Sequence, residues 1–237
     1  MRVRMCVLLL SLAFCACVAT PVKDKKAQAT LARIEQQLLD ARVLRIDYEI
    51  EARGAVSADI SGDLLMQQPA LAALRATGDF ATQPVQPMLV ADGTTMRGGT
   101  ASYFSQPAPA QLRDGLLLGL TRMGVLHNIA MLTQDAPPDA TDGSIRDWVT
   151  VANVRAIDQP RRIGGRTVAG LHFDLIVAGE PAGAVTLWYE PDTALPVARE
   201  QLVQFETGEM RVVERYTVSI DGIIGPCRFD TGALTSD

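Results

Sequence analysis

The sequence contains few of the residues that usually carry catalysis or bind metal ions. Among its 237 residues are two histidines and four cysteines, and aromatic residues make up only 5%. His127 and His172 do not stand in a metal-ligand spacing such as HExxH, and no serine lies in a GxSxG nucleophile elbow. The sequence therefore predicts no catalytic residue, no metal site and no cofactor, and we expect the protein not to be an enzyme.

Basic character and long apolar runs are also missing. The formal net charge is −5 and the pI is near 5.1, whereas a nucleic-acid-binding surface needs a basic face. After the N-terminal segment, no apolar run approaches the roughly 20 residues that span a bilayer. These absences exclude a nucleic-acid partner and an integral membrane protein. The 48% of hydrophobic residues at this length are sufficient for a substantial core.

The first residues have the pattern of a bacterial export signal. Arg2 and Arg4 precede an apolar run over residues 6–16, which predicts a signal peptide over residues 1–19. The segment Phe14-Cys15-Ala16-Cys17 is similar to a lipobox, in which Cys17 is acylated and anchors the protein to a membrane. The alternative is cleavage after Ala19, which frees a soluble protein. We expect a location in the periplasm or at the periplasmic face of the outer membrane of a Gram-negative envelope.

Processing leaves Cys17 and Cys227, or Cys227 alone. At most one cysteine pair remains, which excludes a disulfide framework. Residues 20–28 are polar and rich in lysine, and they predict a tether between the signal and the domain. The folded domain is expected over residues 29–230 and a tail over residues 231–237.

The domain is expected to open with a helix over residues 30–46. Leu31, Ile34, Leu38 and Ala41 follow one another at intervals of three and four, which predicts a stripe that faces a core. Glu35 is expected on another face of the helix. The period then changes to two over residues 46–53 and 56–66, which predicts a long antiparallel hairpin that ends before Pro69.

The next segments are interrupted by proline and glycine. Residues 70–86 predict a short strand with turns. Residues 88–97 predict a hairpin around Asp92-Gly93, a dipeptide typical of two-residue turns, and this register pairs Leu89 with Met96.

A second helix, rich in leucine and methionine, is expected over residues 111–132. Gly115, Gly119 and Gly124 interrupt it, and each costs up to ~1 kcal/mol relative to alanine in a helix interior. The glycines are equally consistent with a mobile element and with a tightly packed core helix whose small residues allow close crossings.

Five further strands are expected between residues 148 and 220. They are joined by turns, without an alternation of helices and strands, so a parallel doubly wound sheet is not expected. The predicted fold is α+β, with a single strongly curved antiparallel sheet of about nine to eleven strands and helices that cover its apolar concave face.

The apolar face of this sheet predicts a hydrophobic ligand. Each methylene group transferred from water to such a surface contributes ~0.8 kcal/mol, and methionine adapts to disordered chains. The alternative is that the same side chains only pack against each other. The residues predicted to line a site for lipid or acyl chains are Tyr48, Ile50, Ile60, Leu64, Met66, Leu89, Met96, Leu116, Leu120, Met123, Phe173, Leu175, Leu187 and Tyr189.

Several short motifs over residues 27–225 resemble the LolA/LolB lipoprotein-carrier superfamily. They are the turn at residues 89–94, the segment 165–173 that leads into a strand, and Leu187-Trp188-Tyr189-Glu190-Pro191-Asp192-Thr193-Ala194-Leu195-Pro196 with its D-x-x-x-P turn. The resemblance implies an unclosed β-barrel, a hydrophobic concavity for the acyl chains of lipoproteins, and a helical lid. It also implies an arginine that bonds the lid shut, with Arg53 and Arg75 as candidates. LolA is not lipidated whereas LolB is.

Three functions follow from these patterns. The first is an exported protein of the bacterial envelope that binds lipid or acyl chains and handles lipids or lipoproteins, attached to the membrane if Cys17 is acylated. The second is a regulatory or scaffolding module with the same fold, a filled apolar face and no lipid ligand. The least favoured is an envelope hydrolase, because nothing in the sequence points to convergent catalytic acids.

Overall fold

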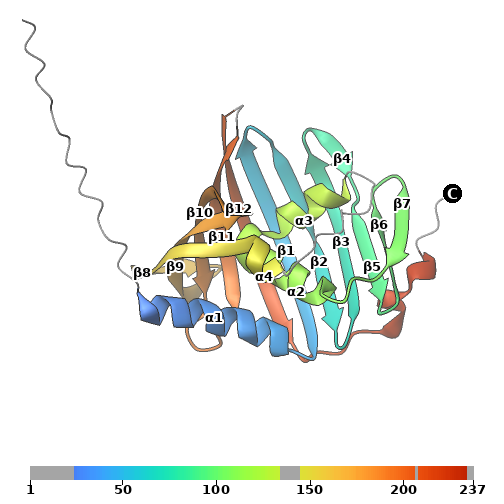
Figure 1. The fold of residues 1–237 in the computed structure, drawn as a ribbon, viewed down its shortest axis with the longest axis horizontal. Coiled ribbons are helices and arrows are strands. Elements are labelled where there is room, and N and C mark those ends of the chain that lie inside the picture. Colours follow the sequence, from blue (N-terminus) through green and yellow to red (C-terminus); the bar gives the residue numbers. More distant parts are fainter. Residues whose placement is uncertain (1–23, 134–144, 206–207, 234–237) are drawn as a thin grey trace, which may run out of the picture.

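The computed structural model describes residues 24–133, 145–205 and 208–233 (Figure 1). The predicted signal peptide, Cys17 and the first residues of the predicted tether lie outside the described residues. The described chain forms one antiparallel sheet of twelve strands, in the order β7-β6-β5-β3-β2-β1-β12-β11-β10-β9-β8, with β4 paired to β3. The α+β prediction of a single unclosed sheet is therefore confirmed, with slightly more strands than expected.

Along the sequence, the strands form two groups that are separated by a central group of helices. The first half consists of α1 (Lys25–Asp40), β1 (Val43–Gly54), β2 (Ala58–Gln67), β3 (Leu71–Phe80), β4 (Gln83–Val85), β5 (Met88–Asp92), β6 (Thr95–Gly99) and β7 (Tyr103–Pro107). The central group and the second half consist of α2 (Leu112–Leu118), the π-helical segment η1 (Gly119–Met123), α3 (Val125–Leu132), α4 (Ile145–Trp148), β8 (Val149–Ile163), β9 (Arg166–Val177), β10 (Glu180–Tyr189), β11 (Pro196–Phe205) and β12 (Gly208–Ile220), followed by the 3₁₀ turns η2 (Pro226–Phe229) and η3 (Thr231–Ala233).

Helix α1 begins earlier and ends earlier than the apolar period suggested. Its N-cap is Asp24, whose side chain accepts a hydrogen bond of 2.9 Å from the Ala27 N–H, the usual way to satisfy a free amide at a helix start. The predicted residues 41–46 instead leave the helix, because β1 begins at Val43. The apolar stripe is buried as predicted, but Glu35 lies on it and is also buried.

Strands β1 and β2 form the predicted hairpin, with Ile50 opposite Ile60. The prediction for residues 70–86 was wrong in extent, because β3 is a full strand of ten residues between β2 and β5. Its alanine-rich start favours a helix by propensity. Pairing with a strand on each side outweighs that preference.

The predicted register of the β5–β6 hairpin was wrong by two residues. Met96 pairs with Ala91, and Leu89 pairs with Gly98. The turn is longer than two residues because the Asp92 carboxylate accepts hydrogen bonds from the N–H groups of Thr94 and Thr95, at 2.9 and 2.8 Å. A shift of two residues keeps every side chain on its face, so Leu89 and Met96 are both buried as expected.

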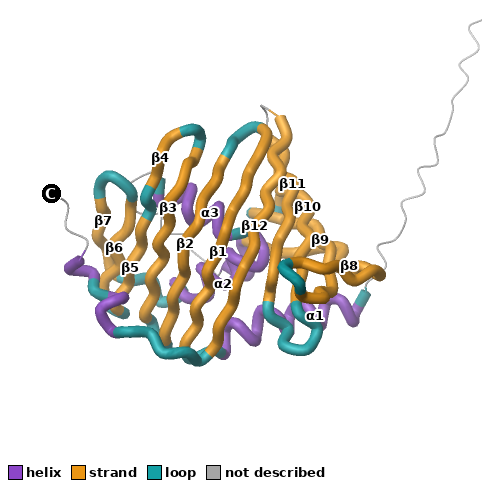
Figure 2. The backbone as a smooth tube through the Cα atoms, turned by 180° about the vertical axis from the view of Figure 1, so that it is seen from behind, coloured by secondary structure: helices purple, strands orange, loops and turns teal. Residues whose placement is uncertain are grey.

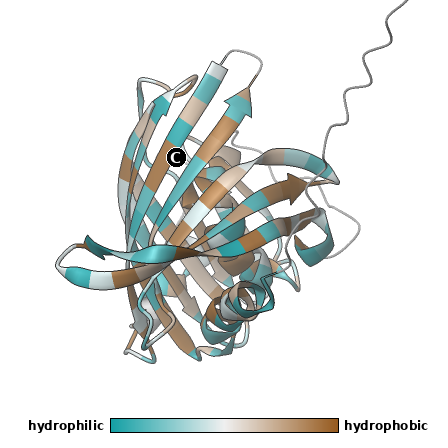
Figure 3. Ribbon diagram, turned by 90° about the vertical axis from the view of Figure 1, so that its left-hand side faces the viewer, coloured by the Kyte–Doolittle hydropathy of each residue, from teal (hydrophilic) through white to brown (hydrophobic). Residues whose placement is uncertain are grey.

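The predicted helix over residues 111–132 is broken at one of its three glycines. Gly124 has φ +93° and separates η1 from α3. We call the whole segment 112–132, which comprises α2, η1 and α3, the helical cover. Figure 1 and Figure 3 show it on the inner side of the curved sheet, which bends around it without closing.

The outer face of the sheet is covered at both ends by other parts of the chain. The C-terminal segment crosses behind β3 and β5 (Figure 2), where Phe229 packs on Leu65, Ala73 and Val90. At the other end the tip of the β8–β9 hairpin folds back, so that Val168 packs with Trp188, Val197 and Ala198. These contacts leave the inner, concave face to the helices.

Candidate ligand site on the concave face

The concave face carries two apolar clusters. The first apolar cluster joins β1, β2, β3, β5, β6 and β12 to the helical cover that packs over them, and the second joins β8, β9 and β10 to α1. The first contains nine of the predicted lining residues, namely Tyr48, Ile50, Ile60, Leu64, Met66, Leu89, Met96, Leu116 and Leu120. The second contains Phe173, Leu175 and Leu187, with Met123 and Tyr189 partly buried against it.

The helical cover packs directly on the first cluster. Leu117, Leu120, Val125 and Ile129 are all buried in that contact. The packing is close: a Cβ atom on Gly98 of β6 would lie 3.0 Å from a methyl carbon of Leu132. In this structure the helices therefore cover the apolar residues of the sheet.

Glu214 connects the sheet to the start of α3. It lies on β12, is fully buried, and accepts hydrogen bonds of 2.9 Å from the backbone N–H groups of Val125 and Leu126. The hydroxyl of Tyr216 also donates to this carboxylate. A carboxylate at the N-terminus of a helix satisfies free amides and interacts favourably with the helix dipole. Glu214 thus holds the start of α3, just after the break at Gly124, against the sheet.

Arg199 on β11 binds the other side of the same break. Its guanidinium donates to the backbone carbonyl oxygen of Arg122 at 2.5 Å and to Oε1 of Gln201 at 2.6 Å. The side chain is fully buried, and burial lowers its pKa from the ordinary value, against the opposing effect of Glu214. Its Nε and Nη1 groups have no hydrogen-bond partner within the described residues, which is costly for a buried cation.

Further polar contacts join the helical cover to α1. Arg122 forms two hydrogen bonds to the carboxylate of Glu35, at 2.7 and 2.9 Å, and both side chains are about nine-tenths buried. Thr121 donates to the same carboxylate at 3.4 Å. At the other end of the cover, Arg113 donates to the carbonyl oxygen of Ala41, just after α1. The cover is therefore bonded to the sheet at its centre and to α1 along its length.

Neither arginine suggested by the resemblance holds the cover. Arg53 pairs with Asp59 at 2.8 Å, and Arg75 donates to the Arg228 carbonyl oxygen of the C-terminal segment at 3.0 Å. Both residues alternate along their strands with the buried concave positions, so they project from the convex face. The cover is held instead by Arg199 of the sheet, and by Arg122 and Arg113 of the cover itself, which bind Glu35 and the Ala41 carbonyl. Only Glu214 gave a signal in the sequence, as a charge within the apolar alternation of β12.

The described residues contain no group of three or more His, Cys, Asp or Glu side chains arranged to hold a metal ion. His127 lies on α3 near Trp148, with ring centroids 6.3 Å apart. Burial, and secondarily the charge of Arg199, lower the pKa of His127. His172 is also shifted to a lower pKa, chiefly by burial, and its Nδ1 lies 3.2 Å from the Thr186 hydroxyl.

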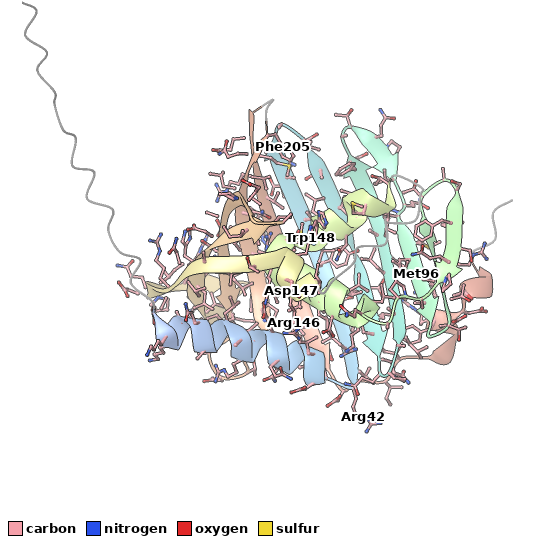
Figure 4. All side chains as sticks on the ribbon, viewed as in Figure 1. Arg42, Met96, Arg146, Asp147, Trp148 and Phe205 are labelled. Atoms are coloured by element: carbon pink, nitrogen blue, oxygen red, sulfur yellow. The ribbon has the colours of Figure 1, made fainter. Side chains whose placement is uncertain are left out.

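Two grooves lie on the convex face rather than under the helices. The larger has a volume of about 670 Å³ and is lined in part by Asp47, Glu49, Arg166 and Arg215. Tyr48 of the predicted acyl site also borders it. The smaller, of about 340 Å³, lies where β1 meets the C-terminal segment. Figure 4, which draws all described side chains, shows the opposite side, with Trp148 and Met96 among the side chains around the helical cover.

No protein-family model matches the sequence, and no curated protein matches it. Among solved structures, the chain is similar to the Mycobacterium tuberculosis lipoprotein LppX, with 12% identity, a TM-score of 0.44 and coverage of 84% of this chain and 100% of LppX. It is also similar to a LolA superfamily protein from Nitrosomonas europaea, with 10% identity, a TM-score of 0.35 and coverage of 88% and 99%.

A third similar structure is MucB from the Pseudomonas aeruginosa MucA/MucB complex, with 16% identity and a TM-score of 0.45. That match covers 88% of this chain and 62% of the MucB-complex chain, so this chain spans less than two thirds of its length. The solved structures to which the chain is similar thus include LolA-like proteins. Within the described residues, none of the helices combines the length and apolar character needed to cross a membrane.

Proposed function

We propose that this protein is an exported binding protein of the bacterial envelope that shelters acyl chains of lipids or lipoproteins on its concave face. It binds without catalysing a reaction. The observation that carries the proposal is a one-sided apolar sheet whose cover is a discontinuous helix, bonded to the sheet by a small number of polar groups around Gly124. Such a cover can separate from the sheet as a unit and expose the lining residues.

Opening of the cover has an energetic cost that a ligand must offset. Opening exposes buried side chains of the helical cover, each worth about 1.5–3 kcal/mol of burial. A twelve-carbon chain supplies roughly 9 kcal/mol when it replaces them, before the cost of immobilising the ligand is counted. One such chain therefore offsets the exposure of only about three to six of these side chains, so displacement of the whole cover requires more than one acyl chain or a partial opening.

The test is displacement of a fluorescent fatty acid together with native mass spectrometry of protein purified from a bacterial envelope. Co-purified lipid and saturable binding of the probe support the proposal. Ile50→Thr on the concave face is expected to weaken probe binding severalfold, whereas Val213→Thr on the convex face is a matched control that leaves it unchanged. A mass without lipid combined with no probe binding contradicts the proposal.

The proposed anchor is tested separately. Labelled palmitate is expected to be incorporated into the full-length protein and to be lost in Cys17→Ala. Incorporation places the protein at the periplasmic face of a membrane, as expected for an outer-membrane lipoprotein. A soluble periplasmic protein without label would instead support cleavage after Ala19.

A regulatory or scaffolding module is the second candidate. It is favoured by one observation, the close packing of the helical cover on the first apolar cluster. In that case a protein partner is recovered from the envelope, and neither lipid nor fluorescent fatty acid binds.

A further inference from the structure

Two charged side chains of the concave face hold peptide groups of the helical cover in a specific way. Arg199 donates to one backbone carbonyl, that of Arg122, and Glu214 accepts from two backbone N–H groups, those of Val125 and Leu126. Arg199 and Glu214 face each other in the register of β11 and β12. Together they present donors and an acceptor to one small region of backbone.

This pair lies between the two apolar clusters. In the strand register, Arg199 is opposite Leu187 of the second cluster, and Glu214 is opposite Ile50 of the first. Side chains opposite one another in antiparallel strands share a face. The four therefore form a row across the concave face, with apolar ends and a polar centre, which suits acyl chains attached to a central polar group.

Arg199 also has unused capacity. Its Nε and Nη1 groups have no hydrogen-bond partner within the described chain, although the side chain is fully buried. Native structures seldom leave buried donors unsatisfied, and an unsatisfied donor on a cation is especially costly. The guanidinium can thus donate hydrogen bonds to more carbonyl groups than the helical cover supplies.

We propose that Arg199 and Glu214 form a recognition site for the amide group of an acylated ligand, and that backbone groups of the helical cover occupy this site until the ligand replaces them. The proposal rests on the proposed function and adds the chemistry of the ligand's polar group. Its carbonyl oxygen binds Arg199 in place of Arg122 O, and its N–H binds Glu214 in place of the α3 amides.

The two charges give the site a defined selectivity. A free carboxylate is attracted by Arg199 but repelled by Glu214, and a free amine is attracted by Glu214 but repelled by Arg199, so neither satisfies both side chains. An ester offers a carbonyl to Arg199 but has no N–H for Glu214. An amide satisfies both side chains, since a hydrogen bond to a charged partner is among the stronger kinds in proteins.

The experiment compares three derivatives of one fatty acid: the N-methyl amide, the methyl ester and the free carboxylate of palmitic acid. Each displaces the fluorescent probe from wild-type protein and from variants. The ratio of two affinities measured on the same variant cancels the cost of opening the helical cover. Wild-type protein is expected to bind the amide about tenfold more tightly than the ester, and also more tightly than the carboxylate, which Glu214 repels.

Glu214→Gln is expected to reduce the amide-to-ester ratio towards one and to lessen the penalty on the carboxylate. Arg199→Met is expected to weaken both carbonyl ligands, with partial recovery in Arg199→Lys. Glu35→Gln is the control, because it loosens the helical cover through Arg122 and does not touch the site. In this control variant the affinities for all three derivatives are expected to change by the same factor, so the ratios between them stay at the wild-type values.

The possible results separate the two proposals. If none of the derivatives and no probe binds, the proposed acyl-binding function is wrong. If all three derivatives bind wild-type protein equally, the acyl site stands and the amide site is overturned. Cooperative thermal unfolding of each variant shows that it is folded. If Arg199→Met does not fold, the isosteric Glu214→Gln still decides the outcome through its ratio.

Discussion

Gly124 leaves no room for a side chain beside Glu214. A Cβ atom at Gly124 would lie 2.5 Å from Oε1 of Glu214 and 2.7 Å from Nη1 of Arg199. The glycine therefore does two things. It allows the backbone conformation with positive φ at which the helix breaks, and it lets both charged side chains approach the broken backbone.

Gly124→Ala is expected to displace the helical cover from the sheet. The change should lower the free energy of unfolding by more than the roughly 1–3 kcal/mol of backbone strain that a side chain meets at this positive φ and extended ψ, and should speed entry of the fluorescent fatty acid. Gly179→Ala is the matched control, because Gly179 has φ +86° and no heavy atom within 4 Å of its Cβ position. Equal losses of stability in the two variants would contradict the role assigned to the contact.

Removal of one partner of the Arg122–Glu35 pair should be more harmful than removal of both. Glu35→Ala leaves a nearly buried guanidinium that keeps only its bond to the Val149 carbonyl. We expect a loss of about 3–5 kcal/mol in unfolding free energy. The double variant Glu35→Leu with Arg122→Met should recover a large part of that loss, as measured by chemical denaturation. If the double variant loses as much unfolding free energy as the single variants lose together, the two side chains stabilise the fold through other contacts and not through each other.

His127 should make the fold sensitive to mild acid. Burial and the charge of Arg199 lower its pKa below the ordinary 6.5. As the pH falls below about 6.5, the unfolded chain takes up a proton at this residue while the folded protein does not, so stability decreases. Denaturation at a series of pH values should show this loss between the ordinary pKa and the lower folded one. His127→Gln should flatten that part of the curve, whereas an unchanged slope would exclude His127 as its source.

Asp92 should affect stability at a lower pH than His127, through loss of a negative charge and not through gain of a positive one. Backbone hydrogen bonds from Thr95 and Thr94 lower the pKa of its carboxyl group. Its contribution to stability is complete above the ordinary pKa of 3.8 and is lost as the pH falls through the lower folded value. Asp92→Asn is expected to remove this acid-dependent step while it retains an acceptor for the turn. If the step persists in the variant, another carboxylate produces it.

The sequence predicted the parts of the fold that local periodicity controls. The alternation in residues 46–66 predicted the β1–β2 hairpin, and the glycines predicted an interrupted helix over residues 111–132. Where two local preferences competed, the prediction failed. The alanines of β3 favour a helix but are paired on both sides, and the Asp92 side chain lengthened a turn that Asp-Gly alone would have made tight.

The candidate site was only partly predictable for a related reason. The apolar lining residues follow from alternation, because a buried face needs apolar side chains along its whole length. Glu35 was expected on a face of the helix away from the core, and nothing in the sequence indicated that Arg199 is buried, since a charged residue is rarely buried unless another segment supplies its partner. Glu35 meets Arg122, and Glu214 meets the start of α3 89 positions away in the chain.

The amino-acid sequence by itself determined the secondary structure of most segments, the apolar side of the sheet and the presence of interrupting glycines in the cover, because all three depend on residues close to one another in the chain. The tertiary structure alone decided which charges are buried, which carbonyl and amide groups they hold, and that the helices occupy the concave face. Those relationships join residues from β11, β12, α1 and the helical cover, and they exist only once the sheet has curved to bring those segments together.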